Sequence, residues 1–136
     1  MKKQIIILFT LVTISVISFT SCEPFIENKI TAINNADYNV TLTLRGKSYP
    51  IPTGESLILN DFKKGSFEYS TVYVVPNGLT PAAEGDVAGT FVLNAGTELL
   101  LVYTSITDAS SYTIYGVLSS SDDVNRVDPF DDGGTP

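Results

Sequence analysis

The sequence contains no histidine, no tryptophan and a single cysteine, Cys22, among its 136 residues. The absence of histidine excludes the Ser-His-Asp and Cys-His arrangements that activate a nucleophile. One cysteine cannot form a disulfide within the chain, and it cannot supply the thiolate set of a structural zinc site. The fold must therefore be held together by its apolar core, and we expect no histidine- or cysteine-dependent catalysis.

Basic residues are also scarce, because 8 Lys and Arg stand against 15 Asp and Glu and give a formal net charge of −7. The sequence has no cluster of basic residues that could displace counterions from a phosphate backbone. We therefore expect no nucleic-acid partner. The same charge disfavours direct binding to an anionic membrane surface, so that a membrane attachment would require a lipid.

Other catalytic and metal-binding patterns are weak. Serine and threonine are plentiful, but none lies in a Gly-x-Ser-x-Gly elbow or beside a lysine at a catalytic spacing. Glu84 and Asp86 could perform acid–base chemistry or bind calcium, although a solvated loop is the simpler interpretation. Residues 128–134 resemble a calcium loop but lack its alternating acids and its terminal glutamate. We expect a protein that is no enzyme and holds no metal or cofactor.

The first residues show the pattern of an export signal. Two lysines precede an apolar run over residues 5–19, which is shorter than the ~20 residues of a transmembrane helix. Thr20 and Ser21 are small residues directly before Cys22, as cleavage by a signal peptidase requires. An ordinary secretory signal with a cysteine near its cleavage site would show the same pattern, so this alternative stays open.

The sequence Phe19-Thr20-Ser21-Cys22 resembles the lipobox of bacterial lipoproteins, with Phe19 where that motif usually has leucine. The resemblance implies that Cys22 receives a diacylglyceryl group, that residues 1–21 are removed, and that the new amino terminus is acylated, for example with palmitate. It also implies attachment to the outer membrane of the cell envelope. Removal of residues 1–21 would take away two lysines and change the formal net charge from −7 to −9.

The remaining residues divide into three regions. Residues 22–28 contain Pro24 and have no periodic pattern, and we interpret them as a tether behind the lipid. Residues 29–120 carry the pattern of a single folded domain. Residues 121–136 are rich in Ser, Asp, Gly and Pro and cannot bury enough apolar surface to offset the entropy of ordering. We therefore expect them to form a disordered acidic tail.

Short strands are predicted throughout the folded region. The clearest is residues 38–45, where Val40, Leu42 and Leu44 alternate with polar residues in the period of a half-buried strand. The other predicted strands cover residues 30–34, 48–51, 56–60, 66–75, 87–94, 97–106 and 110–120.

Individual residues refine the predicted strands. Residues 97–106 are apolar on both faces and should lie in the centre of a sheet. Pro50 indicates an edge strand, because proline has no N–H to donate to a neighbour. Gly46 allows a tight turn after residues 38–45, and Gly116 indicates a bulge within the last strand.

The predicted fold is an all-β antiparallel β-sandwich of about seven to eight short strands, since no stretch shows the spacing of an amphipathic helix. Residues 52–59 and 93–103 resemble the units of strand, glycine turn and strand in small immunoglobulin-like and transthyretin-like domains of bacterial envelope proteins. This resemblance implies a fold class and no particular activity.

Residues 76–86 form the longest interruption between the predicted strands and are the candidate binding loop. Asn77 and Leu79 lie in its first half, and Glu84 and Asp86 add carboxylates at its exit. Loops on rigid sandwiches often carry binding sites, so we expect these four residues to contact a partner. The alternative is a simple crossover between the two sheets, with Leu79 covering the core.

Two functions are compatible with these features. The first is a structural or interaction lipoprotein that binds another envelope component. The second is a carbohydrate-binding accessory module of a glycan uptake system, because seven tyrosines could stack on sugar faces. The alternation of Phe67, Tyr69 and Tyr73 favours a place in the core. The tyrosines whose position the sequence leaves open are Tyr38, Tyr49 and Tyr115.

We predict that Cys22→Ser releases the protein from the membrane. Each buried methylene contributes ~0.8 kcal/mol to membrane binding, and stable anchoring needs more than one chain, all of which the substitution would remove. Cell fractionation of the full chain should find the variant soluble or uncleaved, whereas Ser15→Ala, within the apolar run, should fractionate like the original chain. Recovery of a cleaved Cys22→Ser species in the membranes would contradict the anchor.

Overall fold

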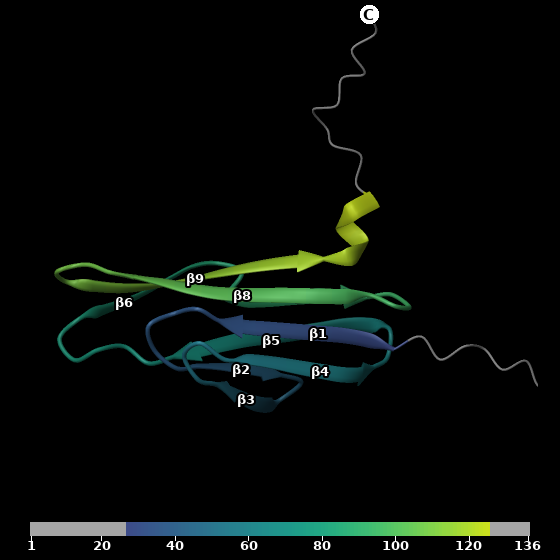
Figure 1. Ribbon diagram of the computed structural model, residues 1–136, viewed down its shortest axis with the longest axis horizontal. Coiled ribbons are helices and arrows are strands. Elements are labelled where there is room, and N and C mark those ends of the chain that lie inside the picture. The colour runs from purple at the N-terminus through teal and green to yellow at the C-terminus, as the bar shows by residue number, and fades with distance from the viewer. Residues whose placement is uncertain (1–26, 126–136) are drawn as a thin grey trace, which may run out of the picture.

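The computed structural model describes residues 27–125, which form nine β-strands followed by a 3-10 helix (Figure 1). The all-β prediction is confirmed, and one strand absent from the prediction, β6, joins the eight expected ones. The elements are β1 (Asn28–Asn34), β2 (Val40–Leu44), β3 (Lys47–Ile51), β4 (Ser56–Phe62), β5 (Gly65–Tyr73), β6 (Thr80–Gly85), β7 (Ala88–Leu93), β8 (Glu98–Thr107), β9 (Ser111–Ser120) and η1 (Ser121–Asn125). Cys22, the signal segment 1–21 and residues 126–136 of the predicted tail lie outside the described residues.

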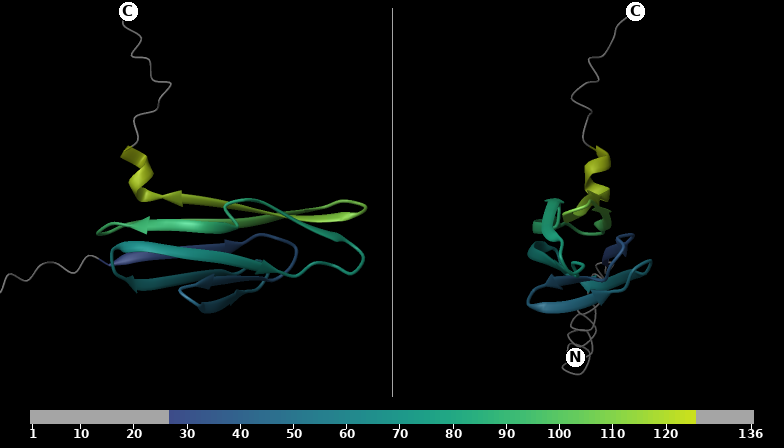
Figure 2. Two further views of the ribbon diagram at one scale, coloured as in Figure 1. Left: turned by 180° about the vertical axis from the view of Figure 1, so that it is seen from behind. Right: turned by 90° about the vertical axis from the view of Figure 1, so that its left-hand side faces the viewer.

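The strands form two sheets that lie face to face as the layers of a sandwich-like domain (Figure 2). One is a five-stranded sheet in the order β4-β1-β8-β9-β6, and the other is a four-stranded sheet in the order β3-β2-β5-β7. β8 is the central strand of its sheet, as its apolar sequence predicts. β3 is an edge strand, as Pro50 predicts.

The five-stranded sheet is mixed, and the prediction of a purely antiparallel sandwich is wrong in this respect. β1 runs parallel to β8, with Ile30 opposite Leu99. β6 runs parallel to β9, with Thr80 opposite Ser111. The alternation of apolar and polar residues shows which side chains are buried, but it carries no information on the direction of the neighbouring strand.

The loop expected over residues 76–86 contains strand β6, which corrects the prediction. The segment begins with a tight turn, in which the Leu79 N–H donates to the Pro76 carbonyl at 3.2 Å and Gly78 has a φ of +88°. The strand itself has no large apolar residue, and all its residues except Ala82 are exposed, so that no sequence signal marks it. The segment carries the chain from the four-stranded to the five-stranded sheet, which agrees with the crossover alternative.

Gly116 marks a close approach of β6 to β9, and the predicted bulge at this residue is wrong. The register between β8 and β9 continues through Gly116 without a shift. A side chain at Gly116 would bring its Cβ to 2.6 Å from the backbone oxygen of Asp86, and one at Gly85 would collide with the Gly116 carbonyl. The Asp86 N–H donates to that carbonyl at 2.7 Å. β6 can pair with β9 in this way because both positions are glycine.

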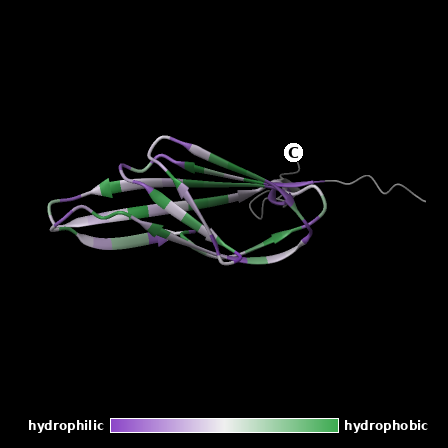
Figure 3. Ribbon diagram, turned by 90° about the horizontal axis from the view of Figure 1, so that it is seen from below, coloured by the Kyte–Doolittle hydropathy of each residue, from purple (hydrophilic) through white to green (hydrophobic). Residues whose placement is uncertain are grey.

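The core lies between the two sheets and is filled by alternate residues of each strand. In β2, Val40, Leu42 and Leu44 are buried, as their alternation predicts. Figure 3 shows the apolar residues along the strands and hydrophilic residues at the turns. Burial of one large apolar side chain contributes about 1.5–3 kcal/mol, so this interior is the main source of stability. The other buried apolar residues are Ile30, Ala32, Ala36, Ile51, Phe67, Tyr69, Phe91, Leu93, Leu99, Leu101, Tyr103, Tyr112 and Ile114.

Asn34, at the end of β1, is a buried polar residue that joins the two sheets. Its Nδ2 donates to the carbonyl oxygens of Tyr38 at 3.0 Å and Ile51 at 2.8 Å. Its Oδ1 accepts the N–H of Ala36 at 3.0 Å. The amide therefore links β1 of the five-stranded sheet to the turn that follows it and to β3 of the four-stranded sheet.

Helix η1 extends the ordered region beyond Ser120, into the segment 121–136 for which we expected no settled structure. The carboxylate of Asp122 accepts hydrogen bonds from Asn94 Nδ2 at 2.8 Å and from Thr97 Oγ1 at 2.9 Å. The Glu98 N–H donates to Ser121 Oγ at 3.0 Å. In the sequence Asp122 belongs to an acidic run, and its partners in the turn between β7 and β8 are too distant along the chain to be recognised.

Three of the four edge strands have features that discourage pairing with another chain. Pro50 in β3 and Pro81 in β6 have no N–H to offer an incoming strand. In β4 the register with β1 shifts between Asn28 and Ile30, and Asp61, within this irregular stretch, has a φ of +65°. The two sheets therefore present interrupted edges.

We predict that Gly116→Ala destabilises the fold by about 1–3 kcal/mol, because its methyl group would overlap the Asp86 backbone and push β6 from β9. Gly89→Ala in β7 is the matched control, since its Cβ would meet Tyr69 only at ordinary contact distances from 3.6 Å. Urea unfolding should show a stability within about 1 kcal/mol of the original chain for the control. Equal stabilities for the two variants would contradict the close approach.

Candidate interaction surface

The structure does not keep the four candidate binding residues together on one loop. Asn77 is exposed in the turn before β6, and Leu79 is half-buried there. Glu84 is exposed on β6, and Asp86 follows the end of that strand. The binding loop expected over residues 76–86 is replaced by a turn and an edge strand.

Asp86 holds strands together. Its Oδ2 accepts the N–H of Leu118 at 2.9 Å, and its backbone oxygen accepts the Tyr69 hydroxyl at 3.0 Å. Its carboxylate is thereby directed to β9. Within residues 27–125, no group of three or more His, Cys, Asp or Glu side chains is placed to hold a metal ion.

Most aromatic side chains in the part of the chain that the structure describes pack against one another in or beside the core. Phe67 and Tyr69 are buried, as their alternation predicts, and the Tyr69 ring lies 5.2 Å from that of Phe91. The three tyrosines whose burial the sequence does not predict lie on different elements. Tyr38 follows the β1–β2 turn and packs edge-on against Tyr112, Tyr49 lies in β3, and Tyr115 lies in β9.

The hydroxyls of Tyr69, Tyr73 and Tyr103 act as hydrogen-bonding groups that stay protonated. Burial raises the pKa of Tyr103 to about 12, although its hydrogen bond with Thr71 at 2.8 Å acts in the opposite direction. Burial and the nearby Asp86 charge raise the pKa of Tyr69, and burial followed by the proximity of Tyr112 raises that of Tyr73. None of these three groups is suited to exchange a proton near neutral pH.

The outward side of the five-stranded sheet, which we call the outer face, carries the most continuous apolar surface. Two rows of residues cross the strands of this face, and within each row the residues are paired with one another on neighbouring strands. The first row is Ile58, Thr31, Leu100 and Ser119, and the second is Ser56, Ile33, Val102 and Val117. The exposed fractions are 55% for Ile58, 39% for Leu100 and 58% for Val117, while Ile33 and Val102 are half-buried.

The middle of the outer face has no charged residue, although the chain is strongly acidic. Lys29 and Glu98 are opposite each other on β1 and β8 at the end of the face, and Glu84 lies on the edge strand β6. A shallow hollow of about 340 Å³ opens beside Leu100 and is bordered by Thr31. An apolar patch with charges at its rim is typical of a contact surface between proteins.

The sequence contained a signal for this surface that we interpreted incompletely. Residues 97–106 are apolar on both faces, which predicts a strand buried on both sides. The structure confirms the central position of β8, but Leu99 and Leu101 face the core while Leu100 faces outward. Among residues 27–125 no second layer covers that outward side, since the sheet has its only partner layer on the inner side. The double apolar pattern therefore indicates a surface that no other element of residues 27–125 covers.

Comparisons of the sequence with models of known protein families and with curated proteins find no match. Within residues 27–125, no helix has the length and apolar character needed to cross a membrane.

We predict that stability falls as the pH rises from about 10 to 12. Tyr103 has an ordinary pKa of 10.0 and a pKa of about 12 in the fold, so its contribution is complete below pH 10 and is lost as the pH rises through 12. The loss should approach 2–3 kcal/mol. Urea unfolding between pH 8 and 12 should show a shallower decline of stability for Tyr103→Phe than for the original chain. Identical declines for the variant and the original chain would contradict this assignment.

Proposed function

We propose that the protein is a bacterial envelope lipoprotein, held at the outer membrane by the acylated Cys22, and that its two-sheet domain is a non-catalytic interaction module. The unique cysteine directly after Phe19-Thr20-Ser21 supports the anchor. The module needs no cofactor, because its contacts are made by the outer face. Its partner is another component of the envelope.

The observation that carries the proposal is the uncovered apolar stripe over Ile33, Ile58, Leu100, Val102 and Val117. Exposed apolar area of this kind is unfavourable in water, and each side chain gains about 25 cal/mol for every Å² that a partner buries. A chain with a net charge of −7 could lower this cost by polar substitution at any of these positions. The retention of apolar residues on a surface favours an interface.

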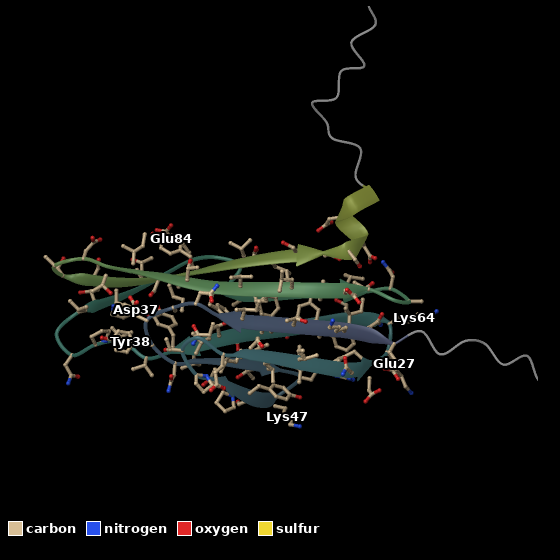
Figure 4. All side chains as sticks on the ribbon, in the orientation of Figure 1. Glu27, Asp37, Tyr38, Lys47, Lys64 and Glu84 are labelled. Atoms are coloured by element: carbon tan, nitrogen blue, oxygen red, sulfur yellow. The ribbon has the colours of Figure 1, made fainter. Side chains whose placement is uncertain are left out.

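The charge distribution supports an orientation relative to the membrane. The five Lys and Arg residues between 27 and 125 all lie in the half of the domain from which residue 27 leaves. Figure 4 shows Lys64 and Glu27 at that end and Asp37 at the other. The turns at the far end carry acids and no base. The half with the bases also carries Glu27, Asp61, Glu98, Asp122 and Asp123, so its charges nearly balance. A tether over residues 22–28 would hold this half toward the membrane and direct the wholly acidic end away from anionic headgroups. The basic residues are Lys29, Arg45, Lys47, Lys63 and Lys64.

We also propose a relationship to small immunoglobulin-like or transthyretin-like envelope domains. The two facing sheets and the short glycine turns support it. The turn between β2 and β3 has positive φ angles at Arg45 and Gly46, 54° and 75°, as in two-residue β-hairpins in general. The parallel pairings of β1 with β8 and of β6 with β9 are the features that any such relative must share.

We predict that Val117→Lys abolishes co-purification of envelope partners with the affinity-tagged full chain after chemical cross-linking. A lysine there would place a charge in the apolar interface, at a cost that weakens binding at least about 100-fold. Val72→Lys is the matched control, because Val72 is a similarly exposed valine, at 65% against 58% for Val117, on the four-stranded sheet. Both variants should unfold at the same temperature as the original chain. Retention of every partner by Val117→Lys would refute the outer face as the interface.

A further inference from the structure

An open flank of the sandwich lies between the edge strands β3 and β4. They are the last strands of the two sheets on this side and lie beside each other, and among the described strands no hydrogen-bonded ladder joins them (Figure 1). Pro50 in β3 and the irregular stretch at Asp61 in β4 hinder strand pairing there. A hollow of about 470 Å³, which we call the flank hollow, opens at this place, within the range of about 300–1,000 Å³ of small-ligand sites.

Apolar side chains from both sheets form the floor of the flank hollow. Tyr49 is the cross-strand neighbour of the buried Leu42, so it lies on the inward side of the four-stranded sheet. Leu59 and Phe62, both half-buried, line the hollow from the five-stranded sheet, and the buried Leu44 lines it from β2. This floor favours an aliphatic chain, because the contact removes apolar surface from water on both sides.

Two cations, Arg45 and Lys47, lie at the rim of the flank hollow. Lys47 is the cross-strand neighbour of Leu44, and its Nζ lies 5.0 Å from the centre of the Tyr49 ring. The Arg45 Cζ lies 4.9 Å from the centre of the Phe67 ring. Within residues 27–125 these ring contacts are the interactions of the two cations, and neither forms an ion pair. Both charges are therefore available to an anion.

The rim has a positive balance although the chain is strongly acidic. Among the described residues that line the hollow, Asp61 carries the only carboxylate, against two cations. Lys63 and Lys64 form the turn that follows β4, so that four of the five bases between residues 27 and 125 lie at the hollow or directly after its lining strand. Glu68 borders Arg45 in another hollow and does not line this one. An anion is attracted here, whereas the net charge of −7 repels it from most of the remaining surface.

We propose that the flank hollow binds an anionic amphiphile, which is an aliphatic chain with a carboxylate or phosphate head. The head lies between Arg45 and Lys47, and the chain lies along Leu59 and Phe62. An uncharged chain would leave the two cations without a partner, and inorganic phosphate would leave the apolar floor in water. The floor and the rim therefore select for both properties in one molecule.

The flank hollow is separate from the outer face, and its chemistry does not depend on the proposed function. Its cations belong to the half of the domain from which residue 27 leaves. With the tether in place, this half is held toward the membrane, and the rim meets lipid heads. A fatty acid in solution presents the same combination of charge and chain, so that the experiment must distinguish these two sources.

The test is photochemical labelling of the purified full chain, in an uncharged detergent, with a medium-chain fatty acid that carries a diazirine. Peptide mass spectrometry should find the label on residues 44–49 or 59–62. Decanoate and decyl phosphate should compete with the label at least about tenfold better than decanol, which has the same chain without a charge. Stronger competition by decyl phosphate identifies a phospholipid head, stronger competition by decanoate identifies a fatty acid, and both results support the site.

A double variant tests the two cations. Lys47→Gln removes one charge, and Arg45→Asn removes the other with a residue type that tolerates the φ of 54° at this position. Together they should lower labelling of the flank hollow at least about tenfold without a change in unfolding temperature. Lys29→Gln is the matched control, because Lys29 does not line the hollow, and it should keep the labelling of the original chain.

Four outcomes would overturn the site. Equal labelling of the double variant and the original chain, or equal competition by decanol, shows that the cations take no part in binding. Label on Leu100 or Val117 alone shows that the apolar outer face is the acceptor. A complete lack of label shows that Lys47 only guards an edge strand. Val117→Lys should leave labelling of the hollow unchanged, so that this site and the proposed function fail independently.

Discussion

The placement of one sheet against the other depends on the buried side-chain amide of Asn34. Its donors and its acceptor are all satisfied by backbone groups of residues in the β1–β2 turn, β3 and the approach to β2, and each unpaired group would cost about 1–3 kcal/mol. The backbone of Asn34 also receives the Gly54 N–H at 2.7 Å. These bonds can all form only when the β2–β3 hairpin lies against the end of β1. The amide thus selects one arrangement of the layers where apolar packing alone would accept several.

Asn28 has the corresponding role at the start of β1. Its Oδ1 accepts the Thr97 N–H at 2.8 Å and its Nδ2 donates to the Phe62 carbonyl at 3.0 Å. These bonds set the height at which β8 begins beside β1. Because side chains alternate along a strand, that height decides whether Leu99 or Leu100 faces the core. Asn28, a polar residue on the neighbouring strand β1, therefore determines which residues of β8 lie on the outer face.

The local sequence was enough to predict a strand and its buried side where the residue pattern has a single physical cause. Val40, Leu42 and Leu44 alternate because one side of β2 is buried, and that side was predicted correctly. β6 escaped prediction because its stability comes from β9 and from the Tyr73 hydroxyl, which donates to the Ala82 carbonyl at 2.9 Å. The parallel pairings, the bonds of Asp122 and the free side of Leu100 likewise depend on partners distant in the chain. The candidate binding residues were placed on a loop for the same reason.

The interrupted edges limit how copies can assemble when they are crowded. Proteins tethered to one surface reach high local concentrations, where an open strand edge would recruit the next chain and start an endless ribbon. Pro50, Pro81 and the irregular end of β4 at Asp61 remove that route from three edges. The fourth edge, β7, remains open, but one open edge in each chain can join only two copies. Crowding of this chain would thus end in small closed assemblies instead of fibrils.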